Sequence, residues 1–178
     1  NDTRDILTKS LQPEPFVGRS RELAMARGAA QAARKGRLQI VLITGEAGIG
    51  KSRLLDHVSR DLQSTGYQVL PGRCPEAPGA PAFWPWIQVL RHHLDASLPG
   101  GLGSLLSGVE DILHILPELR EHVRSTPPPA PRDPSQARFR LFDAIGTCLD
   151  RAAKRIPTAI TIEDLHRSDE TSLLLLCF

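Results

Sequence analysis

The chain has 178 residues, of which 40% are apolar, 24% are charged and 4% are aromatic, and its formal net charge is +2. This length suits one domain with a real core, and the composition excludes the disordered, fibrous and membrane classes. The longest apolar run, Leu173 to Phe178, is far shorter than the roughly 20 residues that a bilayer crossing needs, and no secretory signal pattern opens the chain. We therefore expect a cytoplasmic protein without membrane contact.

The cysteines and the charge exclude two further classes of protein. Cys74, Cys148 and Cys177 are odd in number and lack metal-ligand spacing, so we expect buried or neutral thiols rather than disulfides or a zinc site. The small net charge gives no electrostatic footprint for nucleic acid.

The first elements predict a parallel α/β unit. Residues 1–13 are polar and without a sustained period, which is typical of a tail, and an alanine-rich amphipathic helix follows from Ser20 to Gly36. The branched, apolar run Leu38 to Thr44 predicts a strand that is buried on both faces of a parallel sheet. A helix through residues 54–62 and a short strand from Tyr67 to Leu70 come next, and this order implies a right-handed crossover.

Strand signals disappear over residues 71–157, which we interpret as a helical insertion. Its predicted helices are Trp86 to Leu94, Leu105 to Arg124 and Ser135 to Arg155. The proline-rich segment Thr126 to Pro134 cannot be helical and is predicted to be an extended connector.

The last part of the chain predicts a third strand and a final helix. The strand spans Thr158 to Ile162, and Asp169 is placed to cap a helix over Glu170 to Phe178.

The strongest motif is Gly45-Glu46-Ala47-Gly48-Ile49-Gly50-Lys51-Ser52, which fits the phosphate-loop spacing G-x-x-x-x-G-K-[ST]. It lies between a predicted buried strand and an amphipathic helix. In this arrangement the backbone N–H groups of the loop and the N-terminus of the helix would point toward a bound anion. The glycines let the main chain wrap closely around phosphate oxygens. Lys51 would meet the β and γ phosphates of a nucleotide, and Ser52 would give its hydroxyl to Mg²⁺.

A second candidate group is the acid pair Glu163 and Asp164, which follows the third predicted strand directly. The carboxyl ends of parallel strands form the ligand-binding edge of open α/β sheets. One carboxylate could hold Mg²⁺ while the other orients or deprotonates the attacking water. Consecutive strand residues point to opposite sides, so the residues alone leave the two roles open.

Five segments together resemble one family. They are Phe16-Val17-Gly18-Arg19, Gly45 to Ser52, Gly72-Arg73-Cys74-Pro75-Glu76, Phe83-Trp84-Pro85-Trp86 and Ile162-Glu163-Asp164-Leu165-His166. The chain resembles the nucleotide-binding domain of the STAND signal-transduction ATPases, within the AAA+-related P-loop proteins, as found in large bacterial LuxR-type regulators. The resemblance covers nearly everything from Phe16 to Phe178.

This resemblance implies roles for individual residues. Val17 and Gly18 would approach the adenine, and Arg19 would support that edge of the site. Glu163 would be the Mg²⁺-side acid, where the family commonly has aspartate, and Asp164 would orient the water. It also implies a lid, a sensor array and a DNA-binding domain after the last helix, and we expect the chain to be truncated before them.

We therefore predict a three-layer α/β P-loop NTPase over residues 14–178, with a parallel sheet core and a helical insertion. The predicted function is an ATP- and Mg²⁺-binding switch module of a signalling or transcriptional regulator, with slow ATP hydrolysis to ADP. One alternative is an interaction or scaffold module that does not hydrolyse ATP, and another is a nucleic-acid-remodelling ATPase of the initiator type. Expected partners are other proteins or further copies of the chain, with DNA reached only through domains outside it.

Overall fold

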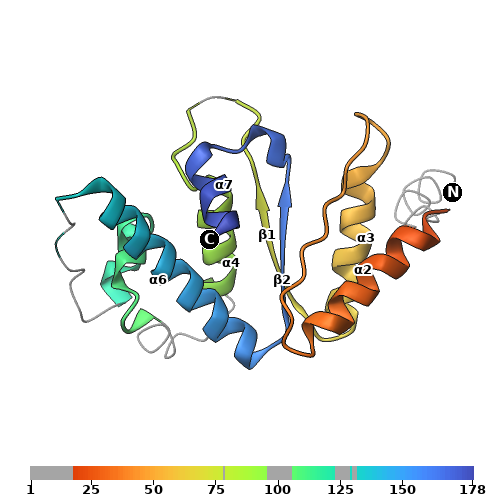
Figure 1. Ribbon diagram of the computed structural model, residues 1–178, viewed down its shortest axis with the longest axis horizontal. Helices are drawn as coiled ribbons and strands as arrows, with labels where there is room; N and C mark the ends of the chain where they lie inside the picture. The colour runs from red at the N-terminus through yellow and green to blue at the C-terminus, as the bar shows by residue number, and fades with distance from the viewer. Residues whose placement is uncertain (1–17, 78, 96–105, 123–128, 130–131) are drawn as a thin grey trace, which may run out of the picture.

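The fold is a small parallel sheet between two layers of helices (Figure 1). The computed structural model describes residues 18–77, 79–95, 106–122, 129 and 132–178. On one side of the sheet lie α2, Ser20–Ala33, and α3, Lys51–Ser64. On the other side lie α4 (Trp84–Asp95), α6 (Pro134–Arg155) and α7 (Glu170–Cys177). This arrangement confirms the predicted layers, although the sheet is smaller than we expected.

The sheet consists of β1, Gln68–Arg73, and β2, Thr158–Glu163, which pair in parallel. Their register runs from Gln68 opposite Thr158 to Arg73 opposite Glu163. Both strands were predicted, and β1 continues beyond its predicted end at Leu70. Because the strands are parallel, their carboxyl ends lie together, and Arg73 is placed beside the acid pair.

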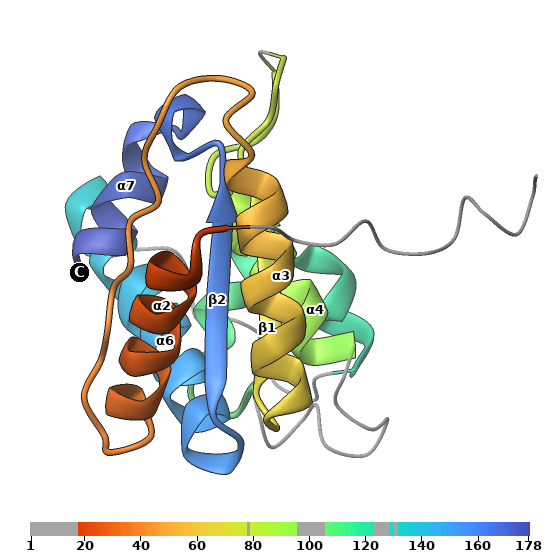
Figure 2. The same cartoon turned by 90° about the vertical axis from the view of Figure 1, so that its right-hand side faces the viewer.

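The predicted strand from Leu38 to Thr44 is wrong. Residues 37–46 are extended but join neither strand by a ladder, and they run separately from the sheet (Figures 1 and 2). The side chains of Leu38, Ile40 and Leu42 are 89%, 72% and 70% exposed. Apolarity and branching predict that a segment favours burial, but they do not specify a partner edge, which depends on tertiary packing.

The two helices that flank this segment are joined through their side chains. Arg27 of α2 forms a bidentate ion pair with Asp61 of α3, with Nε to Oδ2 at 2.7 Å and Nη2 to Oδ1 at 3.0 Å. This pair lowers the pKa of Asp61 below its usual value through the hydrogen bond from Arg27. The phenol of Tyr67, just before β1, donates to the carbonyl of Ala30 in α2 at 2.5 Å. These bonds attach α2 to the layer that carries the glycine-rich loop.

The main hydrophobic core lies on the other side of the sheet, among α4, α6, α7 and the segment between α4 and α6. Leu90, Ile112 and Ile145 are fully buried there. Trp86 is also buried in this core, where its indole Nε1 donates to the Ser172 carbonyl at 3.0 Å. The core therefore joins the predicted helical insertion to the last helix.

One predicted helix of the insertion is wrong. Within Leu105 to Arg124, the described residues form the short 3-10 helices η2, Glu110–His114, and η3, Pro117–His122. Gly108 has a φ of +76°, which ends helical geometry, and Pro117 lacks the N–H that a continuous helix would need. The apolar period therefore marked the buried face of two shorter turns.

The last helix begins as predicted. Asp169 is the N-cap of α7, and its Oδ1 accepts from the backbone N–H of Ser172 at 3.0 Å. Burial by itself would raise the pKa of Asp169, but hydrogen bonds from Ser172 and Thr171 outweigh it and keep this pKa below its usual value. The carboxylate therefore stays ionised at neutral pH.

Some of the segments singled out in the sequence lie outside the residues that the structure describes. The tail 1–13, Val17 and most of the segment 126–134 lie outside the described residues.

Cys74 and Cys148 are buried as predicted, whereas Cys177 is exposed. Burial raises the pKa of Cys148 to about 11. Within the described ranges, no helix combines the length and apolarity required to cross a membrane.

Gly72 fixes the packing of β1 on α4, and we expect Gly72→Ala to lower the free energy of unfolding by about 1 to 3 kcal/mol. An added Cβ would lie 2.5 Å from the Pro85 carbonyl oxygen and 3.2 Å from Val89 Cγ2. Gly28→Ala in α2 is the matched control, because its Cβ would meet nothing within 4 Å, and it should stabilise the helix by about 0.5 to 1 kcal/mol. Urea unfolding measures both, and equal stability of the two variants would contradict the described packing.

Candidate functional site

The glycine-rich loop leads directly into α3, as the motif requires. Gly45, Gly48 and Gly50 have φ values of 152°, 76° and 88°, a region that side-chain-bearing residues rarely adopt. Lys51 and Ser52 are the first residues of α3, whose N-terminal N–H groups carry partial positive charge. The loop therefore has the backbone conformation and the helix N-terminus that suit a phosphate group.

Lys51 closes over its own loop. Its Nζ donates to the carbonyl of Gly45 at 2.9 Å and to that of Glu46 at 2.8 Å. These bonds hold the ammonium group above the loop, where phosphate oxygens would compete with two neutral carbonyls. A charge-assisted bond to phosphate is stronger than a bond to a carbonyl, so this geometry favours exchange to an anion.

Arg19 also contacts the loop. Its backbone is left-handed, with a φ of 58°, and its guanidinium donates to the carbonyls of Ile49 and of Gly50, the latter at 3.3 Å. The resemblance placed Arg19 at the adenine edge, whereas its contacts here are with the backbone of the loop. Gly18 is exposed beside it, with a φ of 86°. Arg19 thus connects the start of α2 to the residues that precede Lys51.

The acid pair lies where β2 ends. Glu163 is the last residue of the strand, and Asp164 follows with a left-handed φ of 54°, which bends the chain sharply. Backbone bonds fix this bend, because Cys74 N–H donates to the Glu163 carbonyl at 3.0 Å and Arg167 N–H to the Asp164 carbonyl at 2.8 Å. A left-handed conformation in a residue other than glycine is a strain that often accompanies function.

The side chain of Asp164 is held by Arg73, at the end of the neighbouring strand. Arg73 Nε donates to Asp164 Oδ2 at 3.1 Å, and Arg73 Nη2 donates to Glu76 Oε1 at 3.2 Å. The hydrogen bond that Arg73 donates to Asp164 is the main cause that raises the pKa of Arg73 above its usual value. Arg73 was given no role from the sequence, because the predicted strand ended at Leu70 and only the register of the two strands brings Arg73 beside the acid pair.

The loop and the acids occupy the same end of the molecule. In Figure 2 the loop that leads into α3 and the carboxyl end of β2 both lie toward the top of the view. Their hydrogen bonds differ, since Lys51 donates to its own loop and Asp164 accepts from Arg73. The candidate groups therefore lie at one end of the molecule, in two separate hydrogen-bonding networks.

The candidate metal ligands at the loop and the acid pair are oxygen atoms, which Mg²⁺ prefers. No group of three or more His, Cys, Asp or Glu side chains that could hold a metal ion occurs in the described segments. Mg²⁺ is usually held by one or two protein oxygens together with phosphate oxygens and water. The Ser52 hydroxyl, in the first turn of α3, and the Glu163 carboxylate, at the end of β2, are oxygen ligands of that kind.

Comparison with known proteins gives a family and one distant relative. A family model described as "AAA ATPase domain" matches residues 15–178. An uncharacterized protein of Rhizobium meliloti (strain 1021), R02095, is 26% identical over 180 residues, which cover 91% of this chain and 17% of the relative. The chain thus spans less than a fifth of that relative's length. No solved structure matches the chain.

Proposed function

The chain belongs to the AAA ATPase domain family, and from this premise we propose that it binds ATP with Mg²⁺ and acts as the nucleotide switch of a larger regulator. The observation that carries the proposal is the loop over residues 45–52, with its left-handed glycines and with Lys51 at the start of α3. A regulator of the STAND type is the finer form of this proposal, and it rests on the sequence resemblance.

In this proposal each group at the edge has one task. The loop N–H groups and Lys51 hold the phosphates, and Ser52 and Glu163 provide oxygen ligands for the metal. Bound Mg²⁺ would neutralise charge on the phosphate oxygens. Asp164 would accept a hydrogen bond from water and orient it for attack on the γ phosphate.

The ion pair between Arg73 and Asp164 supports slow hydrolysis. A carboxylate oxygen that already accepts a hydrogen bond is less available to a water molecule. One oxygen of Asp164 is also engaged by Arg73 at 3.1 Å, so it must exchange partners before it orients water. We therefore propose that the domain binds nucleotide more readily than it hydrolyses it.

Two measurements test the proposed function and separate it from a scaffold that never uses nucleotide. The first is titration of the chain with ATP in the presence of Mg²⁺, and the second is steady-state phosphate release. Saturable binding with slow release is expected. Binding without any release would favour the non-hydrolysing module, and salt-dependent DNA binding would favour the remodelling ATPase.

We expect Arg73→Gln to raise the basal rate of ATP hydrolysis several-fold, because it removes the cation that engages Asp164. Arg91→Gln is a matched control. Arg91 forms an ion pair with Glu118, with Nη2 to Oε1 at 2.7 Å, and this pair does not involve Glu163 or Asp164. The measurement is phosphate release at saturating ATP, together with the affinity for ATP, which should change little. A lower rate in Arg73→Gln would show that Arg73 supports the reaction instead of restraining it.

A further inference from the structure

Arg19 contacts the glycine-rich loop at the two peptide units that lead into α3. Its guanidinium donates to the carbonyl of Ile49 and, through Nη1, to the carbonyl of Gly50 at 3.3 Å. Its Nη2 lies 3.7 Å from the point that a Cβ on Gly50 would occupy. The guanidinium therefore covers one side of the backbone just before Lys51.

The other side of these two peptide units carries the donors that a phosphate needs. A trans peptide is planar, and its C=O and N–H groups point in opposite directions. The carbonyls of Ile49 and Gly50 point toward Arg19. The N–H groups of the same units, which belong to Gly50 and Lys51, therefore point away from it. In the part of the chain that the structure describes, neither N–H group has a hydrogen-bond partner, so both can bind an anion at the start of α3.

The position of Arg19 is fixed by α2 rather than by the loop. Arg19 is the N-cap residue of α2, and its carbonyl accepts from the N–H of Leu23 at 3.0 Å. The ion pair between Arg27 and Asp61 attaches α2 to α3. Because its backbone belongs to a helix that is attached in this way, Arg19 can hold the loop in one conformation.

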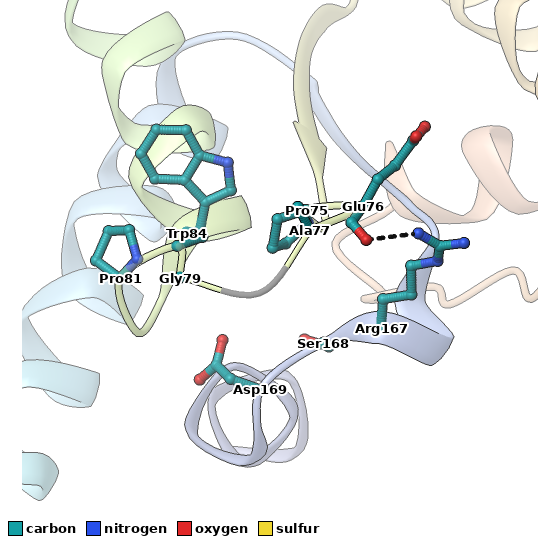
Figure 3. Close-up of a pocket in the computed structure, with 10 residues that line it drawn as sticks. Pro75, Glu76, Ala77, Gly79, Pro81, Trp84, Arg167, Ser168 and Asp169 are labelled. Atoms are coloured by element: carbon teal, nitrogen blue, oxygen red, sulfur yellow. Dashed lines mark hydrogen bonds between the residues drawn. The ribbon is translucent and has the colours of Figure 1, made fainter.

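Arginine donates to backbone carbonyls at two other places, and these show what is particular to the contact at the loop. Arg167, at the end of η4 (Leu165–Arg167), donates through Nη1 to the Glu76 carbonyl at 3.0 Å (Figure 3). Arg34 donates to the carbonyl of Thr65, the residue that follows α3. Glu76 lies in a bend and Thr65 at the end of a helix, so neither contact orients N–H groups at the start of a helix.

We propose that Arg19 is a positioning residue of the phosphate site. It holds the carbonyls of Ile49 and Gly50, and it thereby keeps the N–H groups of Gly50 and Lys51 turned toward the place of a phosphate before the ligand arrives. A cation at a carbonyl also polarises the peptide unit and strengthens its N–H as a donor. The proposal rests on the proposed function, because it concerns the same loop, and it differs from the adenine-edge role that the sequence resemblance implies.

The two roles of Arg19 predict different ligand preferences. A residue that orients the N–H groups of the loop acts on the phosphates, so its loss should weaken binding of ATP and of inorganic tripolyphosphate by the same factor. Loss of a residue at the adenine edge should weaken binding of ATP alone, since tripolyphosphate has no base.

The test is calorimetric titration of the full chain with ATP and with tripolyphosphate, each in the presence of Mg²⁺. We expect Arg19→Gln to weaken binding of both ligands about five- to tenfold, because the N–H donors are no longer held in place. Arg21→Gln is the control for charge, since Arg21 is an exposed arginine of α2 close to Arg19. Arg34→Gln is the control for a contact with a carbonyl, at the other end of the same two helices. Both controls should bind both ligands as the wild-type chain does.

A second variant, Arg19→Gly, separates loss of position from loss of fold. Glycine readily adopts the left-handed φ of 58° at this position and is accepted as an N-cap residue, so α2 should remain intact. Arg19→Gly should lose as much affinity as Arg19→Gln. In NMR spectra, the amide protons of Gly50 and Lys51 should shift less on addition of tripolyphosphate than they do in the wild-type chain.

The possible outcomes separate this proposal from the proposed function. Tripolyphosphate binding that is unchanged in both Arg19 variants would overturn the positioning role, and weaker binding of ATP alone would assign Arg19 to the base. An equal loss of affinity in Arg21→Gln would show that only net charge matters, which also overturns it. If the folded wild-type chain binds neither ligand, the proposed function fails, and the role of Arg19 fails with it.

Discussion

Lys51→Ala is expected to weaken ATP binding by about 10- to 150-fold, which corresponds to roughly 1.5 to 3 kcal/mol for a lost charge-assisted contact with phosphate. The expectation follows from the position of the ammonium, 2.9 Å from the Gly45 carbonyl and 2.8 Å from that of Glu46, above the loop that would hold the phosphates. Equilibrium titration with a fluorescent ATP analogue measures the effect.

Lys35→Ala is the control for this variant. Lys35 is an exposed lysine in the turn after α2, so its removal changes the net charge equally without changing the loop. Thermal unfolding of both variants separates loss of binding from loss of fold. Unchanged ATP affinity in a folded Lys51→Ala protein would show that the loop is not the phosphate site.

Substitution of the two acids is expected to divide binding from turnover. Asp164→Asn should lower the rate of hydrolysis by about 10²- to 10⁴-fold, the usual contribution of a positioned general base, and should leave ATP affinity nearly unchanged. Glu163→Gln should weaken Mg²⁺-dependent binding of ATP, because it removes a charged oxygen ligand from the metal.

The two substituted residues are adjacent in the sequence and each substitution removes one negative charge, so each variant is a control for the other. Titration with and without Mg²⁺ and phosphate release at saturating ATP give the two readouts. If Asp164→Asn weakens Mg²⁺-dependent binding and Glu163→Gln spares it, the roles of the two acids are reversed. If neither variant alters binding or turnover, the acid pair is not part of the site.

Local patterns predicted most elements of the fold because they report local physics. The apolar period and the caps located α2, α3 and α7, and Asp169 caps α7 as expected. The failures concern tertiary pairing. The run from Leu38 to Thr44 has the composition of a buried strand, yet a strand exists only where a partner edge accepts it. Similarly, the apolar pattern before Pro117 gave the buried face but not the type of helix.

The candidate site shows the same division. The glycine spacing predicted the loop conformation before Lys51 and Ser52, because this conformation depends on consecutive residues. Arg73 became evident only when the register of β1 and β2 was known, since it contacts Asp164 across two strands that are far apart in sequence.

The most direct test of the central claim is titration of the purified chain with a fluorescent ATP analogue, first with Mg²⁺ and then with a chelator. Saturable binding is expected, and ATP and ADP should displace the analogue, with weaker binding when Mg²⁺ is removed. No saturable binding at millimolar nucleotide, in a chain shown to be folded by its thermal unfolding transition, would contradict it.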